Sequence, residues 1–128
     1  MQGLSPQNIA PPRDNGTACI AVIEKDLSGN GDHVVGGPPG RRFEVLDCWF
    51  VATNSVGAAL TVKNGSDNIS DAMSKSTTPN TLTRAGAVEQ ANADIVKGSD
   101  LVASFASAGD PSARLYVLIL IKPGVTRT

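Results

Sequence analysis

Histidine, cysteine and aromatic residues are scarce in this 128-residue chain, and their scarcity argues against catalysis. The single histidine is His33, and the two cysteines are Cys19 and Cys48. A serine or cysteine nucleophile usually needs a histidine base and a third group that orients it, and this set also lacks the paired spacing of a zinc site. Three Phe, one Trp and one Tyr offer little for stacking on sugars or bases. We therefore expect neither an enzyme nor a bound cofactor.

A strong net charge and long apolar runs are also missing. The chain carries 11 Lys and Arg against 12 Asp and Glu, a formal net charge of -1, so no basic field would draw it onto nucleic acid or anionic lipid. No run approaches the roughly 18 apolar residues of a membrane helix, and the N-terminus lacks the apolar core of a secretory signal. We expect a protein made in a cytoplasm, without membrane or direct nucleic-acid contact, whose two cysteines are reduced and buried in apolar runs.

The first 16 residues differ in composition from the rest. They contain Pro6, Pro11 and Pro12 with few large apolar side chains, and such a stretch does not nucleate a packed element by itself. We predict an extended N-terminal arm over 1–16 and a single domain over 17–128.

Short apolar segments recur about every ten residues beyond the arm. β-Branched and aromatic residues are concentrated in them, and Gly, Pro and Asn lie between them, as in an antiparallel sandwich or barrel. Strands are predicted at 17–27, 41–54, 57–65, 67–74, 99–107 and 114–122. Pro123 and Gly124 are expected to end the last of them.

Two segments between the strands have a different character. Residues 28–40 are dense in Gly and Pro, which predicts a long loop. Residues 87–98 show some helical periodicity between glycines, and they form either one short helix or an irregular loop.

The stretch LDCWFVAT, residues 46–53, holds the only Trp of the chain, and both of its faces are mostly apolar. Strand alternation predicts two sets of side chains pointing to opposite sides of a sheet, Leu46, Cys48, Phe50 and Ala52 on one side and Val45, Asp47, Trp49 and Val51 on the other. A partner subunit must cover the second set if no part of the same subunit does.

Four large side chains are predicted either to fill the core or to make contacts between copies of the chain: Trp49, Val51, Phe105 and Tyr116. Core is favoured for the aromatic ones, because aromatic side chains in central strands usually fill a sandwich.

The oxygen-rich stretch DLSGNGDH is the best metal candidate. Asp26, Ser28 and Asn30 occupy the first, third and fifth positions of a calcium loop, and Asp32 is a further candidate ligand. The twelfth position holds Gly37 rather than Glu, and a strand rather than a helix precedes the loop. Since Gly, Asn and Asp are also favoured in tight turns, an ordinary turn explains the same residues.

The stretch GGPPGRRF resembles a phosphate-binding loop only in its glycine content. It lacks the terminal Gly-Lys-Ser or Gly-Lys-Thr and precedes a strand. Arg41 and Arg42 are therefore interpreted as a solvated pair or as a contact to an acidic partner surface.

Several short motifs follow one another over 45–122 in a characteristic order. They are Cys48-Trp49, a hairpin VKNG (62–65) followed by ISDAM (69–73), RAGAV (84–88) followed by Ala91, Ile95 and Gly98, and RLYVL (114–118). In this succession the chain resembles the small cement, or decoration, proteins of tailed double-stranded DNA bacteriophage heads.

The resemblance implies an all-β, jelly-roll-like antiparallel sandwich with at most one short helix, made in a bacterial host and placed on the outer surface of the virion head. It further implies a homodimer or homotrimer that bridges subunits of the major capsid protein. Extended segments suit such contacts, so the arm and the 28–42 loop are the expected capsid contacts. The residues named for this role are Ile9, Pro11, Pro12, Arg13, Arg41 and Arg42. The alternative is a β-module that binds carbohydrate or calcium as an adhesion surface of the virion.

Overall fold

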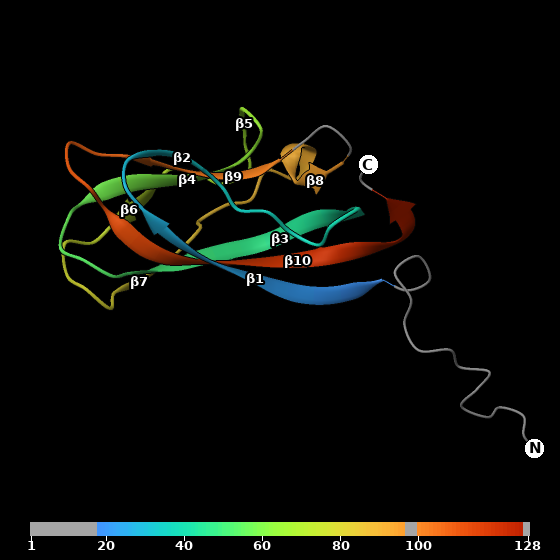
Figure 1. The fold of residues 1–128 in the computed structure, drawn as a ribbon, viewed down its shortest axis with the longest axis horizontal. Coiled ribbons are helices and arrows are strands. Elements are labelled where there is room, and N and C mark those ends of the chain that lie inside the picture. Colours follow the sequence, from blue (N-terminus) through green and yellow to red (C-terminus); the bar gives the residue numbers. More distant parts are fainter. Residues whose placement is uncertain (1–17, 97–99, 127–128) are drawn as a thin grey trace, which may run out of the picture.

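The computed structural model describes residues 18–96 and 100–126 and arranges them in two antiparallel sheets, one above the other (Figure 1). The first sheet has the order β1 (Cys19–Ser28), β10 (Ser112–Thr126), β3 (Arg41–Ala52) and β7 (Leu82–Arg84), with β8 (Asp94–Ile95) also paired to β3. The second has the order β2 (Gly31–Val34), β9 (Leu101–Ala106), β4 (Ala58–Asn64) and β5 (Asp67–Asn68), with β6 (Met73–Lys75) also paired to β4. The predicted antiparallel β-sandwich is confirmed.

The core lies between the two sheets and takes alternate side chains from each. β10 shows the pattern most clearly, because Leu115, Val117 and Ile119 are fully buried, the intervening Tyr116 and Leu118 are half-buried, and the preceding Arg114 is exposed. The three phenylalanines belong to this core, with Phe43 and Phe50 entirely buried and Phe105 2% exposed. Truncating one such ring to Ala typically costs about 3–5 kcal/mol, so each phenylalanine is among the larger single contributors to the packing energy.

A bulge in β3 changes which of its side chains enter the core. Leu118 of β10 pairs with Asp47, but Ile119 pairs with Val45, so Leu46 is an extra residue without an opposite partner. An extra residue reverses the alternation on either side of it. Val45 is therefore completely buried, and the prediction that it shares a face with Trp49 is wrong.

The long loop predicted over 28–40 is wrong in its first part. Only Gly29 and Asn30 separate β1 from β2, and β2 pairs with β9 of the second sheet. The turn is possible because Gly29 and Gly31 both adopt φ of 96°, a left-handed conformation that costs glycine little.

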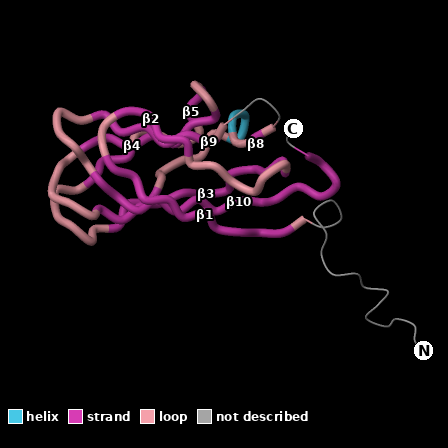
Figure 2. Tube along the Cα trace, viewed as in Figure 1, coloured by secondary structure: helices cyan, strands magenta, loops and turns pink. Residues whose placement is uncertain are grey.

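Three further elements differ from the sequence prediction. The polar stretch before Gly86 contains the short strand β7, and β10 continues through Pro123 to Thr126 instead of ending there. The segment 67–74 forms two very short strands, β5 and β6, in place of one. Over the described part of 87–98, residues 87–96, the open choice resolves to a 3₁₀ turn, Gln90–Asn92, followed by β8 (Figure 2).

Lys75 is a buried cation that fastens a turn to the second sheet. Its side chain is 4% exposed, and Nζ donates to the main-chain oxygens of Asn54, Val56 and Ser76 and to Oδ1 of Asn54 at 2.6–3.3 Å. Burial lowers the pKa of Lys75, while the oxygens replace the water that the ammonium loses. The turn after β3 is thereby held against β6.

The two cysteines lie in different environments, which corrects the expectation that both are buried. Cys48 is fully buried, whereas Cys19 is exposed because it begins β1, the edge strand of its sheet. Burial, with smaller contributions from Asp47 and Asp71, raises the pKa of the Cys48 thiol to about 12.

An alkylating reagent at pH 8 should therefore modify Cys19 and leave Cys48 intact in the native protein, because the reactive thiolate of Cys48 is suppressed and shielded. Peptide mass spectrometry after labelling with and without denaturant checks this. Labelling of Cys48 without denaturant would show that the core opens at this strand.

Candidate interaction surface

The outward side of the first sheet, formed by the outward side chains of β1, β10, β3 and β7, is called the outer face here. Three of the five large apolar residues that are exposed in the described ranges lie on it. These are Ile20, Val22 and Leu82, which are 64%, 49% and 62% exposed. Apolar exposure concentrated on one sheet face of a small domain is typical of a contact surface.

The strand registers arrange the outer face in rows that run across the sheet. One row contains Glu24, Tyr116, Trp49 and Arg84, on β1, β10, β3 and β7 in turn. It is called the aromatic row below. The next row contains Asp26, Arg114, Val51 and Leu82. Each row thus begins with an acidic residue on the edge strand β1 and ends on β7.

The only Trp and the only Tyr of the chain are neighbours in the aromatic row. Trp49 and Tyr116 are stacked, with ring centroids 6.0 Å apart and planes inclined by 12°. Both side chains are half-buried and lie outside the core, because their strand neighbours Cys48 and Val117 point inward. The preference for Trp49 and Tyr116 as core residues therefore does not hold, and Val51 is on the same outer side.

Ion pairs lie among the apolar residues of the outer face. Arg84 Nε donates to Oδ2 of Asp47 at 2.8 Å, and Lys122 Nζ donates to Oε1 of Glu44 at 3.0 Å. Pairing with Asp47 raises the pKa of Arg84. Because the Arg84 side chain is largely exposed to water, its pair with Asp47 contributes little to the stability of the subunit.

A third ion pair on the outer face is unbalanced in charge. Arg114 Nε donates to Oδ1 of Asp26 at 2.8 Å, and Arg114 Nη1 lies 4.0 Å from Oε1 of Glu24. One guanidinium thus serves two carboxylates. The hydrogen bond from Arg114 lowers the pKa of Asp26. This corner of the outer face thus holds two acidic side chains and one arginine.

A hollow of about 400 Å³, called the outer pocket, opens beside the aromatic row. It is lined by Asp47, Trp49, Leu82, Arg84 and Leu118. Its lining combines three apolar side chains, Trp49, Leu82 and Leu118, with the ion pair of Arg84 and Asp47. Such an arrangement suits one aliphatic side chain together with a few polar contacts.

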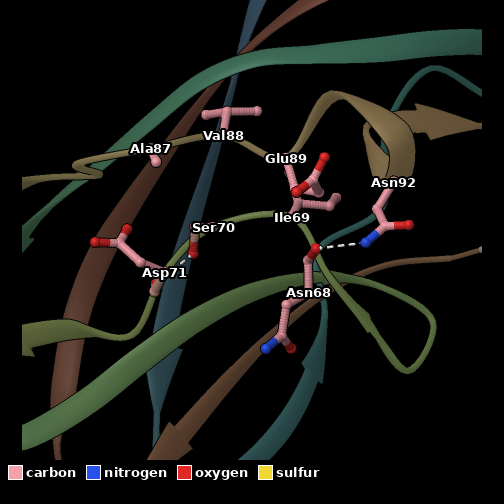
Figure 3. A pocket seen from close by; sticks show the side chains of 8 residues that line it. All are labelled: Asn68, Ile69, Ser70, Asp71, Ala87, Val88, Glu89 and Asn92. Carbon is pink, nitrogen blue, oxygen red and sulfur yellow. Dashed lines mark hydrogen bonds between the residues drawn. The ribbon is translucent and has the colours of Figure 1, made fainter.

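A second hollow of about 390 Å³ lies elsewhere, between the segments 68–71 and 87–92 (Figure 3). Its carboxylates are already engaged by the main chain, since Asp71 Oδ1 accepts from Gly86 N at 3.3 Å and Glu89 Oε1 accepts from Ala91 N at 3.3 Å. The hydrogen bond of 2.8 Å from Asn92 Nδ2 to the Asn68 oxygen closes one end. These contacts describe a structural junction of two segments.

The two arginines predicted as partner contacts are engaged within the subunit. Arg42 Nε contacts both carboxylate oxygens of Asp94 at 3.0 and 3.1 Å, and Arg41 Nη2 donates to the Lys122 oxygen at 2.6 Å. Arg42 thereby lowers the pKa of Asp94. Both arginines serve to hold β3 against β8 and β10.

The candidate calcium ligands are not arranged as one loop. Asp26 and Ser28 belong to β1 and Asp32 to β2, and Asp26 is paired with Arg114. Nδ2 of Asn30 donates to the Ser107 oxygen at 2.6 Å, which uses this side chain as a link to β9. Within residues 18–96 and 100–126 no cluster of three or more His, Cys, Asp or Glu side chains could hold a metal ion.

The remaining predicted site residues divide into two groups. Phe105 lies in the core. The arm residues fall outside the described residues: Ile9, Pro11, Pro12 and Arg13. The sequence did not single out Leu82 and Arg84, because they lie in a polar stretch. It also did not predict that Ile20 and Val22 are exposed, which follows from the edge position of β1.

Comparison with known proteins gives a likeness in fold. No family model matches the chain, and no curated protein matches it in sequence. A chain of the cyanophage Pam1 capsid asymmetric unit is similar, with a TM-score of 0.50 and 16% identity over 88% of this chain and 92% of that one. A weaker likeness, with a TM-score of 0.37 and 9% identity over 88% and 86%, is to the virus-like particle of the extra small virus of the giant freshwater prawn Macrobrachium rosenbergii. Separately, no helix in the described part of the chain is long and apolar enough to cross a membrane.

Substitutions on the two faces of the first sheet should have different effects on the stability of the subunit. Leu82→Ser should change the free energy of unfolding by less than about 0.5 kcal/mol, because Leu82 is 62% exposed in the subunit. Phe50→Ala should cost about 3–5 kcal/mol, because that ring is fully buried. Denaturant unfolding of both variants checks this, and a large loss for Leu82→Ser would mean that the outer face is packed within the subunit.

Proposed function

We propose that the chain is a structural protein of a virus particle, a decoration protein that binds the outside of a bacteriophage head and stabilises the shell by bridging subunits of the major capsid protein. The observation that carries the proposal is the outer face, an apolar sheet surface with Trp, Tyr and Arg at its centre and ion pairs among its side chains. The fold likeness to a chain of a cyanophage capsid and the succession of motifs over 45–122 support the same role.

The composition of the outer face supports protein contact. Trp, Tyr and Arg are the residues most often found at the energetic centre of protein interfaces, where neighbouring groups exclude water from them. Here Trp49, Tyr116, Arg84 and Arg114 lie in two adjacent rows. A partner that covers these rows would bury apolar surface already held in place by the rigid β3 and β10 pair, so little conformational entropy is lost on binding.

The stabilising effect follows from binding linkage. A protein that binds the assembled shell and not its separate subunits stabilises the shell by RT ln(1 + [L]/Kd), about 2.7 kcal/mol per site at a hundred-fold excess over Kd. Summed over many sites, such binding opposes the outward pressure of packaged DNA.

A charge placed on the outer face should weaken this binding. Leu82→Asp should weaken attachment to shells of the major capsid protein by at least about ten-fold, because an unpaired carboxylate would be desolvated in the interface. Co-sedimentation with shells measures the attachment, and the heat inactivation of decorated particles measures its consequence.

A matched control is available on the other sheet. Val34 of β2 is 60% exposed, nearly the same as Leu82, so Val34→Asp introduces the same charge at equal exposure. It should bind shells as the unchanged protein does. Equal loss in both variants, or no loss in either, would refute the assignment of shell contact to the outer face.

Carbohydrate binding is the second candidate, and the half-buried stack of Trp49 on Tyr116 on the outer face, with Arg84 and Asp47 beside Trp49, is the observation that favours it. Sugars pack on aromatic rings while charged groups bond to their hydroxyls. Titration of host surface polysaccharide should then shift the fluorescence of Trp49, the only Trp. Saturable shifts abolished by Tyr116→Ala would favour adhesion over shell binding.

A further inference from the structure

β1 is a long edge strand whose outer margin is open within the described ranges. Its ten residues pair with β10 in an unbroken register and with no other described strand. The other described edge strands, β2, β5, β6, β7 and β8, are only two to four residues long. Short strands, bulges and prolines protect sheet edges from pairing with another chain, and β1 has none of them. This edge is therefore the one built to accept a further strand.

The main-chain groups at the open edge belong to the even-numbered residues of β1. Gly29 N donates to the Pro111 oxygen at 2.9 Å and continues the β1–β10 register, so Gly29 directs its main chain toward β10. In an antiparallel ladder, residues bonded to one neighbour alternate with residues directed to the other side. Ile20, Val22 and Glu24 therefore direct their N–H and C=O groups away from β10, along the open edge.

The distribution of charge along β1 selects a second copy of the same strand as the partner. Residues 19–23 are uncharged, and Glu24, Lys25 and Asp26 follow them. When two identical strands pair antiparallel, their uncharged halves can lie against each other while the charged halves extend toward opposite ends. A deeper overlap places Glu24 opposite Ile20 or Val22, and a still deeper one places it opposite itself, where like charges repel. The strand thus complements itself in one register.

We propose that β1 pairs antiparallel with β1 of a second copy, about a two-fold axis at Ala21, and so joins the two first sheets into one. Ile20 then lies opposite Val22 of the second copy, and each such pair exchanges two main-chain hydrogen bonds. Ala21 meets Ala21 in a pair without these bonds, where Cα atoms approach to about 4.5 Å and a small side chain fits. The contact is the same on both copies, so it closes with two of them.

This pairing leaves the outer face free, because it uses main-chain groups at the edge of the sheet. Ile20 and Val22 keep their side chains on the outer face, beside those of the second copy, so the two outer faces form one continuous surface. A dimer would bring two such surfaces to a shell at once and bind it with higher avidity. The inference itself does not rest on the proposed function, because the free protein is sufficient to test it.

Disulfide formation in the free, full-length protein tests the register. Ile23→Cys should give a covalent dimer through the native Cys19 of the second copy, because opposite residues without ladder hydrogen bonds have Cα atoms about 4.5 Å apart, within disulfide range. Lys25→Cys, two residues further on the same side of the strand, is the matched control and should yield at least about ten-fold less dimer. The unchanged protein should yield none, since its two Cys19 residues are offset by about 13 Å along the strands. Mass spectrometry of the linked peptides identifies the joined residues.

The main-chain bonds are tested by Val22→Pro. Proline removes an N–H that β10 does not use, and edge strands tolerate proline at such positions, so the subunit should still fold. Without this donor, the pairs on both sides of the axis lose a hydrogen bond, and the dimer Kd should rise at least about ten-fold. Val22→Thr keeps the N–H and the β-branched shape and should raise the Kd by less than about three-fold. Sedimentation of a dilution series measures both constants, and denaturant unfolding shows that the variants are folded.

Three results would overturn the proposal. The first is a monomer at every concentration together with no crosslink in Ile23→Cys, a readout that holds even if Val22→Pro does not fold. The second is equal crosslinking of Lys25→Cys, which would mean another register. The third is a dimer that a folded Val22→Pro does not weaken. A monomer in which Val22→Pro lowers only shell binding likewise assigns the edge to a strand of the shell. A crosslinked dimer that does not bind shells would instead refute the decoration role and leave the β1 pairing standing.

Discussion

The antiparallel pairing of β3 with β10 controls both sides of the molecule at once. Each strand sends alternate side chains into the core and the intervening ones to the outer face, so a shift of one residue in register would exchange the two sets. Phe50 opposite Leu115 and Trp49 opposite Tyr116 are successive pairs of the same ladder. The buried pairs determine the register, and the register then determines which exposed side chains are neighbours.

The bulge at Leu46 makes this arrangement possible over the whole length of β3. Without an extra residue, the alternation that buries Phe50 and Cys48 would turn Val45 outward and Leu46 inward. With it, Phe43 and Val45 continue the core, while Asp47 next to the bulge accepts from Cys48 N at 2.8 Å and pairs with Arg84. The bulge therefore lies next to Asp47, whose ion pair with Arg84 is on the outer face.

The charged side chains of the outer face are paired, and they keep this partly apolar surface compatible with water in an isolated subunit. Arg84, Arg114 and Lys122 each have a carboxylate partner, so ion pairs are interspersed among the apolar side chains of this face. The charged residues of β1 lie in its second half, beyond Ile23, so the first half of this edge strand stays apolar. Edge strands of that kind are open to pairing.

Composition and periodicity were sufficient to predict the class of fold, because strand alternation and turn residues are local properties of the chain. The positions of β1, β3, β4, β9 and β10 follow from this pattern. The short strands β5 to β8 do not, because they owe their existence to pairing with β3 or β4 and have little propensity of their own.

The sequence by itself argued against catalysis, because it contains one histidine and no set of residues spaced like metal ligands. It also indicated that LDCWFVAT, with its Trp, Cys and Phe, forms a central strand. Only the tertiary structure decided that Trp49 points away from the core, that Arg42 is bound to Asp94, and that Tyr116, Trp49 and Arg84 form one row. The reason is that a bulge and the order of strands in a sheet depend on residues far apart in the chain, and no local pattern records them.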